Sequence, residues 1–441
     1  MANGEIFLFM RYRKYVLTIF FICFAFVSWA QPKTDSLLKK ILFESHQPIL
    51  NDVLNNPDSF RVQIIYTRIN RDKHNKPSFQ NYYFNVDSNI YFNPASTVKL
   101  PLALLALEKL NAINRKGVDK FSRLQIDSNY TWQTPMYYDN TSENGYPSIA
   151  QFIRKAFLVS DNDAYNRLYQ FVGPQEINRN LHKKGYPTVR ITRQFLGLTL
   201  EQNRHTNQIR FIDQDGSLIY KQPSAYNTDS FYFEKSVKIG RGYLNGKDSL
   251  INTPIDFTRV NNLILKDQQQ ILQSALFPES LPKSRRFNLT KSDYSFLKQY
   301  LSQFPSETNY PKYDGGEYYD SYVKFLFRDS AHAMPVGVRV FNKVGWAYGF
   351  LIDVSYVADF THQIEYMLSA VIYVNKDGIL NDNKYEYDET GWPFMYQLGQ
   401  AIYQYELKRE RKHIPDLKNF KVNYEKRNSE DHRPTVKNVD N

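Results

Sequence analysis

A serine and a lysine three residues apart stand at the start of a strongly apolar stretch of this chain. They are Ser96 and Lys99, and the sequence from Leu100 to Leu107 is almost wholly aliphatic. Residues at i and i+3 share one face of a helix, so both side chains would lie near its N-terminus, where unpaired N–H groups favour a developing negative charge. Burial against apolar side chains would lower the pKa of Lys99 and make it a usable base. The pair therefore predicts an activated serine nucleophile.

The Ser-x-x-Lys spacing is not specific by itself. It occurs at five serines: Ser36, Ser96, Ser280, Ser295 and Ser321. Only Ser96 opens a long helix that is apolar all round, which is the pattern of a helix buried at the centre of a domain. The alternative is that Ser96 and Thr97 only cap this helix. Pro101 is not tolerated inside a helix, so the nucleophile hypothesis requires the helix to begin close to Ser96.

A second polar group is Ser160-Asp161-Asn162, which occurs once in the chain. In a cleft, a serine hydroxyl can pass a proton between a base and a leaving nitrogen, and an asparagine amide can hold a substrate carbonyl or amide. We expect this tripeptide between two helices, at 149–158 and 164–172. The alternative is a polar loop whose side chains cap the second helix.

A third candidate group is Lys343-Val344-Gly345, followed by Trp346. A lysine on a strand edge can bind a substrate carboxylate, and the glycine leaves room for a ligand to lie against backbone N–H groups. Lys-x-Gly also occurs at three other lysines, Lys183, Lys238 and Lys376, so the alternative is a surface lysine at a hairpin corner. Its position between two predicted strands favours the functional interpretation.

The elements that would position these groups follow from the residue pattern. Strands are predicted at 61–67, 81–86, 336–340, 350–357 and 364–374. Further helices are predicted at 34–54, 257–276, 291–304 and 390–407, with a hairpin turn at 213–216. Strands at both ends of the sequence around a helical middle predict an α+β fold. We expect an antiparallel five-stranded sheet flanked by helices, an all-helical lobe, and a cleft between the two.

The chain is predicted to be exported to the periplasm or the outside of the cell. A basic start, an apolar core at 15–27 and the small-x-small sequence Ser28-Trp29-Ala30 predict a signal peptide over residues 1–30, too short for a comfortable membrane span. The single cysteine, Cys23, lies inside it. After cleavage the chain would have no stable membrane span, no disulfide and no cysteine metal site.

Residues 31–407 are predicted to form one domain, with an insertion-rich middle at about 207–319 and a charged, flexible tail at 408–441. The net charge of +11 is scattered over the sequence, and export argues against nucleic acid as the partner. An anionic small substrate or a polyanionic envelope suits this charge better. The histidines are isolated and no glycine-rich phosphate loop stands out, so we expect no metal and no cofactor.

Together and in this order, the three groups resemble the Ser-x-x-Lys, Ser-Asp-Asn and Lys-Thr-Gly motifs of class A β-lactamases and the related penicillin-binding proteins. The resemblance implies that Ser96 is the acylated nucleophile, that Lys99 is its base, and that Ser160 passes a proton to the departing nitrogen. It implies substrate binding by four further residues: Asn162, Lys343, Gly345 and Trp346. The oxyanion hole would consist of the backbone N–H groups of Ser96 and Trp346.

Two departures from the family pattern bear on activity. Val344 replaces a hydroxyl residue that would add a hydrogen bond to the substrate carboxylate. The segment 189–198 resembles the start of the loop that carries the water-activating glutamate of class A enzymes, but it contains no acid, and Glu201 is the nearest candidate.

We therefore expect a serine hydrolase that opens β-lactam rings through a Ser96 acyl-enzyme. The alternatives are a D-alanyl-D-alanine carboxypeptidase acting on peptidoglycan peptides, another amide or ester hydrolase, and a non-catalytic penicillin-binding or sensor domain.

Overall fold

The computed structural model describes residues 33–233 and 235–439, and the predicted signal peptide lies outside these ranges. The described residues from Thr34 onward form one compact unit. Among them, no helix has the length and apolar character needed to cross a bilayer.

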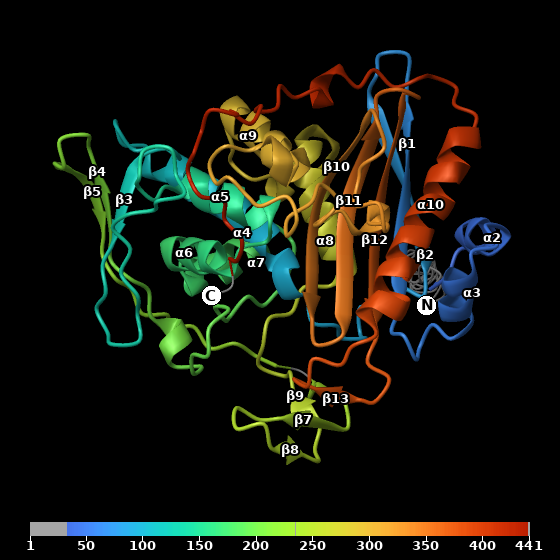
Figure 1. The fold of residues 1–441 in the computed structure, drawn as a ribbon, viewed down its shortest axis with the longest axis horizontal. Helices are drawn as coiled ribbons and strands as arrows, with labels where there is room; N and C mark the ends of the chain where they lie inside the picture. The colour runs from blue at the N-terminus through green and yellow to red at the C-terminus, as the bar shows by residue number, and fades with distance from the viewer. Residues whose placement is uncertain (1–32, 234, 440–441) are drawn as a thin grey trace, which may run out of the picture. The chain divides into compact units, whose positions relative to one another are not determined.

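A five-stranded antiparallel sheet lies at the centre of this unit (Figure 1), as the sequence predicts. The strand order is β10-β11-β12-β1-β2, so β10 forms one edge. The strands are β1 (Gln63–Arg71), β2 (Pro77–Phe84), β10 (Val338–Ala347), β11 (Phe350–Asp359) and β12 (Ile364–Tyr373). Because consecutive side chains of a strand point to opposite faces, the sheet separates two apolar cores. In β1, Ile64 and Tyr66 belong to one core, and Ile65 and Ile69 belong to the other.

Three helices cover one face of the sheet (Figure 1): α2 (Ser36–Glu44), α3 (Pro48–Asn55) and α10 (Trp392–Lys408). The single helix predicted at 34–54 is therefore two helices. The break lies at His46, which has a positive φ of 53°, and Pro48 then starts the second helix. Proline is tolerated there because the first residues of a helix have no intrahelical N–H partner.

The opposite face of the sheet packs against the helical lobe. Its helices are α4 (Lys99–Ile113), α5 (Ile149–Leu158), α6 (Asn162–Val172), α7 (Pro174–Lys183), α8 (Leu265–Leu276) and α9 (Lys291–Ser302). The lobe also contains a three-stranded sheet of β3 (Arg123–Ile126), β4 (Ile209–Ile212) and β5 (Leu218–Gln222). The prediction of an all-helical lobe needs this correction, whereas the hairpin turn at 213–216 is confirmed by the pairing of β4 with β5.

The predicted insertion at 207–319 contributes to both the core and the periphery. Helices α8 and α9 belong to it, and α8 packs directly on β11 and β12. Five short strands form two small peripheral sheets: β6 (Lys238–Ile239), β7 (Gly242–Leu244), β8 (Leu250–Ile251), β9 (Ile255–Asp256) and β13 (Ile379–Leu380).

The segment after α10 is not a loose tail over its described part, and that prediction is wrong for residues 409–439. Leu417 and Phe420 are buried in the same core as α4 and α8. Farther on, Tyr300 donates a hydrogen bond to Glu425 at 2.7 Å, and Asp314 N–H donates to Val436 at 3.0 Å. A few well-placed apolar side chains thus attach a segment whose overall composition is charged.

Phe420→Ala is expected to lower the free energy of unfolding by about 3–5 kcal/mol, because it removes a buried aromatic side chain from a packed core. The Phe420 ring lies 4.7 Å from the Tyr356 ring and 5.0 Å from the Phe277 ring. Urea denaturation would measure the loss. The exposed Lys412→Ala is the control, and equal stability of both variants would restore the loose-tail interpretation.

Candidate active site

Ser96 lies in a short 3-10 turn, η1 (Ala95–Val98), which leads directly into α4. Pro101 is the third residue of α4, so it falls in the first turn, where the hypothesis required it. No side chain caps the start of α4, so Ser96 is not a capping residue. Ala95, just before the serine, has a positive φ of 45°, a strained conformation of the kind found at functional sites.

Lys99 is fully buried, and its Nζ donates a hydrogen bond to Ser96 Oγ at 2.9 Å. All five Ser-x-x-Lys pairs lie in the described ranges, and only at Ser96 do the lysine and the serine hydrogen-bond to each other. Ser321 and Lys324 are also both buried, but Lys324 donates to other acceptors. The tertiary structure therefore distinguishes one pair from four that have the same spacing.

The Ser160 group meets this pair from the loop between α5 and α6. Lys99 Nζ donates to Asn162 Oδ1 at 2.8 Å and to Ser160 Oγ at 3.3 Å, and it also donates to the Ser160 carbonyl. Ser160 has a positive φ of 64°, which turns its side chain and its carbonyl toward the same amine. The capping alternative holds for Asp161 alone, which accepts from Ala164 N–H at 2.7 Å.

Lys343 reaches the same point from the edge strand β10. Its Nζ donates to Ser160 Oγ at 2.8 Å and to the Val344 carbonyl at 2.8 Å. Burial lowers the pKa of the Lys343 ammonium well below its usual value, and the nearby charge of Lys99 lowers it further. Val344 is fully buried in the core against α10, on the face of the sheet opposite Lys343.

Gly345 and Trp346 bring the strand backbone against the serine. A Cβ atom at Gly345 would lie 2.8 Å from the Pro94 carbonyl oxygen and 3.0 Å from Ser96 N. The close approach of strand β10 to the Ser96 turn therefore requires glycine at this position. The Trp346 side chain packs on the other face of the sheet, against the rings of Tyr322 and Phe325, so only its backbone is offered to this site.

Gly345→Ala is expected to slow acylation of Ser96 by about a hundredfold, because a displacement of about 1 Å at the reacting atoms has an effect of that size. The new methyl group meets backbone atoms, which cannot rotate away. Gly246→Ala is the matched control, since nothing lies within 4 Å of a Cβ there. Labelling with a fluorescent penicillin would measure both rates, and equal rates would contradict the tight approach of β10.

The geometry thus joins five predicted side chains in one hydrogen-bonded network. Lys99 links Ser96 to Ser160 and Asn162, and Lys343 completes the chain at Ser160. Two amines donate to Ser160 Oγ, which leaves its own proton available to a third group. Chemically, this is a nucleophile with an adjacent amine base and a hydroxyl relay. The catalytic and binding roles themselves stay predictions.

Phe195 is a residue of this site that the sequence did not identify. Its ring centroid lies 5.2 Å from Lys99 Nζ and stacks on the Tyr165 ring at 4.3 Å. Asn166 fixes the loop by accepting a hydrogen bond from Phe195 N–H at 2.7 Å. Phe195 belongs to the segment in which the resemblance predicts an acid. An aromatic ring therefore faces Lys99 from the segment where the resemblance predicts a glutamate.

Glu201 does not lie at the position of the expected water-activating glutamate. Its side chain is 66% exposed and lies 3.7 Å from His205 and 3.9 Å from Arg204. Asp161 is buried, and burial raises its pKa, but its carboxylate is occupied as the cap of α6.

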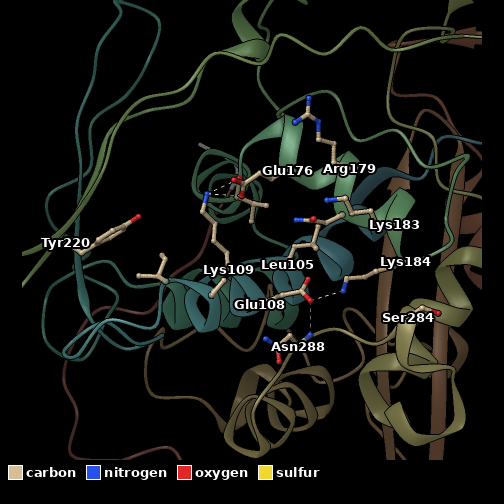
Figure 2. A pocket seen from close by; sticks show the side chains of 14 residues that line it. Leu105, Glu108, Lys109, Glu176, Arg179, Lys183, Lys184, Tyr220, Ser284 and Asn288 are labelled. Atoms are coloured by element: carbon tan, nitrogen blue, oxygen red, sulfur yellow. Dashed lines mark hydrogen bonds and ion pairs between the residues drawn. The ribbon is translucent and has the colours of Figure 1, made fainter.

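A wide cavity of the described residues lies elsewhere, between the C-terminal half of α4 and α7 (Figure 2). It has a volume of about 820 Å³, and none of the predicted site residues lines it. Its two carboxylates are paired, Glu108 with Lys184 at 2.7 Å and Glu176 with Lys109 at 3.2 Å (Figure 2). This cavity therefore supplies no acid to the site. Within the described ranges, no cluster of three acidic, histidine or cysteine side chains has a geometry that could hold a metal ion.

Residues 49–215 match the model of a family described as the β-lactamase enzyme family. The resemblance to the β-lactamase family is confirmed over this stretch. It contains Ser96, Lys99, Ser160 and Asn162, whereas Lys343, Gly345 and Trp346 lie beyond it. No curated protein matches the chain.

Several solved β-lactamase structures are similar to this chain. The β-lactamase from Streptosporangium roseum is 13% identical with a TM-score of 0.45, covering 83% of this chain and 99% of its own. The one from Burkholderia ambifaria is 12% identical with a TM-score of 0.44, covering 81% and 98%. The one from Xanthomonas campestris is 12% identical with a TM-score of 0.45, covering 80% and 95%.

Proposed function

We propose that this protein is an exported serine hydrolase of the β-lactamase type, in which β-lactams acylate Ser96. The observation that carries the proposal is the hydrogen bond of 2.9 Å between Lys99 Nζ and Ser96 Oγ, inside the stretch that matches the β-lactamase family. Export rests on the signal-like sequence at 1–30.

The acylation step follows from the contacts. Neutral Lys99 takes the proton of Ser96 Oγ, which attacks the lactam carbonyl carbon. The negative charge that develops on the carbonyl oxygen is stabilised by the N–H groups of Ser96 and Trp346. The ring C–N bond then breaks as Ser160 donates its proton to the departing nitrogen, and the Lys99 ammonium restores that proton to Ser160 over 3.3 Å. The product is an ester between the opened lactam and Ser96.

Lys343 and Asn162 are assigned to substrate binding. When Lys343 is protonated it binds the substrate carboxylate as a point charge, and a bound anion favours that form of the amine. Asn162 presents an amide beside Lys99 for the amide side chain of the substrate.

Phe195 favours a second candidate function, a penicillin-binding enzyme or sensor with a long-lived acyl-enzyme. Hydrolysis of the ester needs a base that activates water, and a phenyl ring cannot accept a proton. A ring 5.2 Å from Lys99 Nζ also occupies space that an ordered water would need. We therefore propose that acylation is faster than deacylation.

One experiment tests both candidates. The mature protein is incubated with penicillin and with a chromogenic cephalosporin, and the intact mass and the colour change are followed together. A stoichiometric adduct that persists for hours supports the penicillin-binding function, and rapid colour change supports a lactamase. Release of D-alanine from a cell-wall peptide, without lactam turnover, supports a peptidase. Folded protein with no adduct and no turnover contradicts the proposal.

A further inference from the structure

A buried lysine lies behind the edge strand, on the α10 side of the sheet. Lys324 is 1% exposed, and its Nζ donates to the Leu301 carbonyl at 2.8 Å, the Val340 carbonyl at 2.9 Å and Asn342 Oδ1 at 2.7 Å. An ammonium has three N–H donors, so this site uses all of them. Two of the acceptors, Val340 and Asn342, belong to β10 itself.

Asn342 links this lysine to a buried aspartate. Its Nδ2 donates to Asp353 Oδ1 at 2.8 Å and to the Val323 carbonyl at 2.8 Å. Asp353 is fully buried, and Ser355 donates to the same carboxylate oxygen at 2.6 Å. One amide therefore bridges an ammonium and a carboxylate that do not touch each other.

This bridge lies directly behind the candidate site. Asn342 immediately precedes Lys343, and Asp353 pairs with Val344 in the register of β10 with β11. The Lys343 side chain projects to the other face of the strand, toward Ser160. Buried charges are poorly screened, so both charges of the bridge act on Lys343 through the sheet.

The two charges of the bridge shift the pKa of Lys343 in opposite directions. After burial itself, Lys99 and Lys324 lower the pKa of Lys343, whereas Asp353 raises it. Burial lowers the pKa of Lys324 to about 7 and raises the pKa of Asp353 to about 6. The other charged groups that act on Lys324 are Arg339 and Glu307, which pair with each other at 2.7 Å.

We propose that Lys324, Asn342 and Asp353 form a positioning relay for the candidate site, which anchors β10 and sets the electric field at Lys343. Two buried groups of opposite charge add little net stability over apolar residues of the same volume, so packing alone does not account for these three side chains. The relay rests on the role proposed above for Lys343, because the orientation and charge of that amine are what it controls.

The test is a titration of Lys343 in three single variants. Lys324→Gln keeps N–H donors and removes the positive charge, and Asp353→Asn removes the negative charge at nearly constant shape. Asp359→Asn is the matched control: Asp359 is equally buried in β11 and hydrogen-bonded to His362 and Tyr403, but it pairs with Val338 at the far end of β10. The Cε–Nζ correlation of lysine-labelled protein reports each midpoint by NMR, with the Lys343 signal assigned by its loss in Lys343→Arg.

The midpoint of Lys343 is expected to rise in Lys324→Gln and to fall in Asp353→Asn, with about one pH unit between the two variants and no change in Asp359→Asn. The pH profile of acylation by fluorescent penicillin should move in the same two directions. Shifts in one common direction, or an unchanged midpoint in Asp353→Asn, would overturn the relay. If the wild-type protein is not acylated at all, the proposed function fails, and the NMR titration still decides about the relay.

Discussion

Ser96→Ala is expected to abolish covalent labelling by penicillin, with a fall in the acylation rate of at least about a thousandfold. The reason is chemical: Ser96 Oγ is the atom proposed to form the ester, and among the five described Ser-x-x-Lys serines it alone accepts a hydrogen bond from the lysine of its own motif. Ser160 is the nearest substitute, but it accepts from two amines and lies one side chain farther along the hydrogen-bonded chain. Intact mass after exposure to penicillin would show whether any adduct remains.

Ser295→Ala is the matched control for this prediction. Ser295 and Lys298 have the same Ser-x-x-Lys spacing, and both belong to α9. Ser295 Oγ donates to the Lys291 carbonyl at 3.1 Å, and Lys298 Nζ donates to the Asn419 carbonyl at 3.0 Å, so this pair is not joined. Full labelling of Ser295→Ala is expected. A persistent adduct in Ser96→Ala would show that another residue is the nucleophile.

The central sheet could be predicted because its strands have a distinct residue pattern in the sequence. β11 and β12 are buried along almost their whole length and read as continuous runs of β-branched, aromatic and aliphatic residues. The break between α2 and α3 is less visible, because it depends on the positive φ of His46. The packing of residues 409–439 escaped prediction because a few buried side chains, Phe420 above all, attach a segment that is otherwise charged.

The geometric convergence of the site could also be predicted, since each motif lies in or beside an element that the sequence indicates. Ser96 precedes an apolar helix, Ser160 follows an amphipathic one, and Lys343 lies in an edge strand. The surroundings of these residues could not be predicted from the sequence. Contacts such as Phe195 with Lys99, or Lys324 with Asn342, join residues that are far apart in the sequence and have no periodic signal.

The contrast between Lys99 and Lys324 shows why spacing alone does not identify a nucleophile. Both lysines are buried, and both follow a serine by three residues. Lys324 donates its three N–H groups to two backbone carbonyls and one side-chain amide oxygen, so Ser321 accepts none of these hydrogen bonds. Lys99 meets the side chains of Ser96, Ser160 and Asn162. The partners of the amine, and not its burial, separate a proposed base from a structural cation.

Phe195→Glu is expected to shorten the lifetime of the acyl-enzyme by about 10²–10⁴-fold, the usual effect of a positioned general base. A glutamate at this position would place its carboxylate near the present ring, which lies 5.2 Å from Lys99 Nζ. The position is only partly buried, so a charged side chain and a water are both tolerable there. The intact mass of the adduct, followed over time after removal of free penicillin, measures the lifetime.

Phe195→Leu is the control that separates the effect of the new base on the adduct lifetime from the effect of losing the ring. Both variants lose the stacking of Phe195 on Tyr165 at 4.3 Å, so both loosen the loop to a similar extent. Only the glutamate can take a proton from water, so only Phe195→Glu should turn over a chromogenic cephalosporin repeatedly. Equal adduct lifetimes in the two variants would show that opening the space, and not supplying a base, limits deacylation. Rapid deacylation by the wild-type protein would show that another group already activates water, and Phe195 would then lose the role proposed for it.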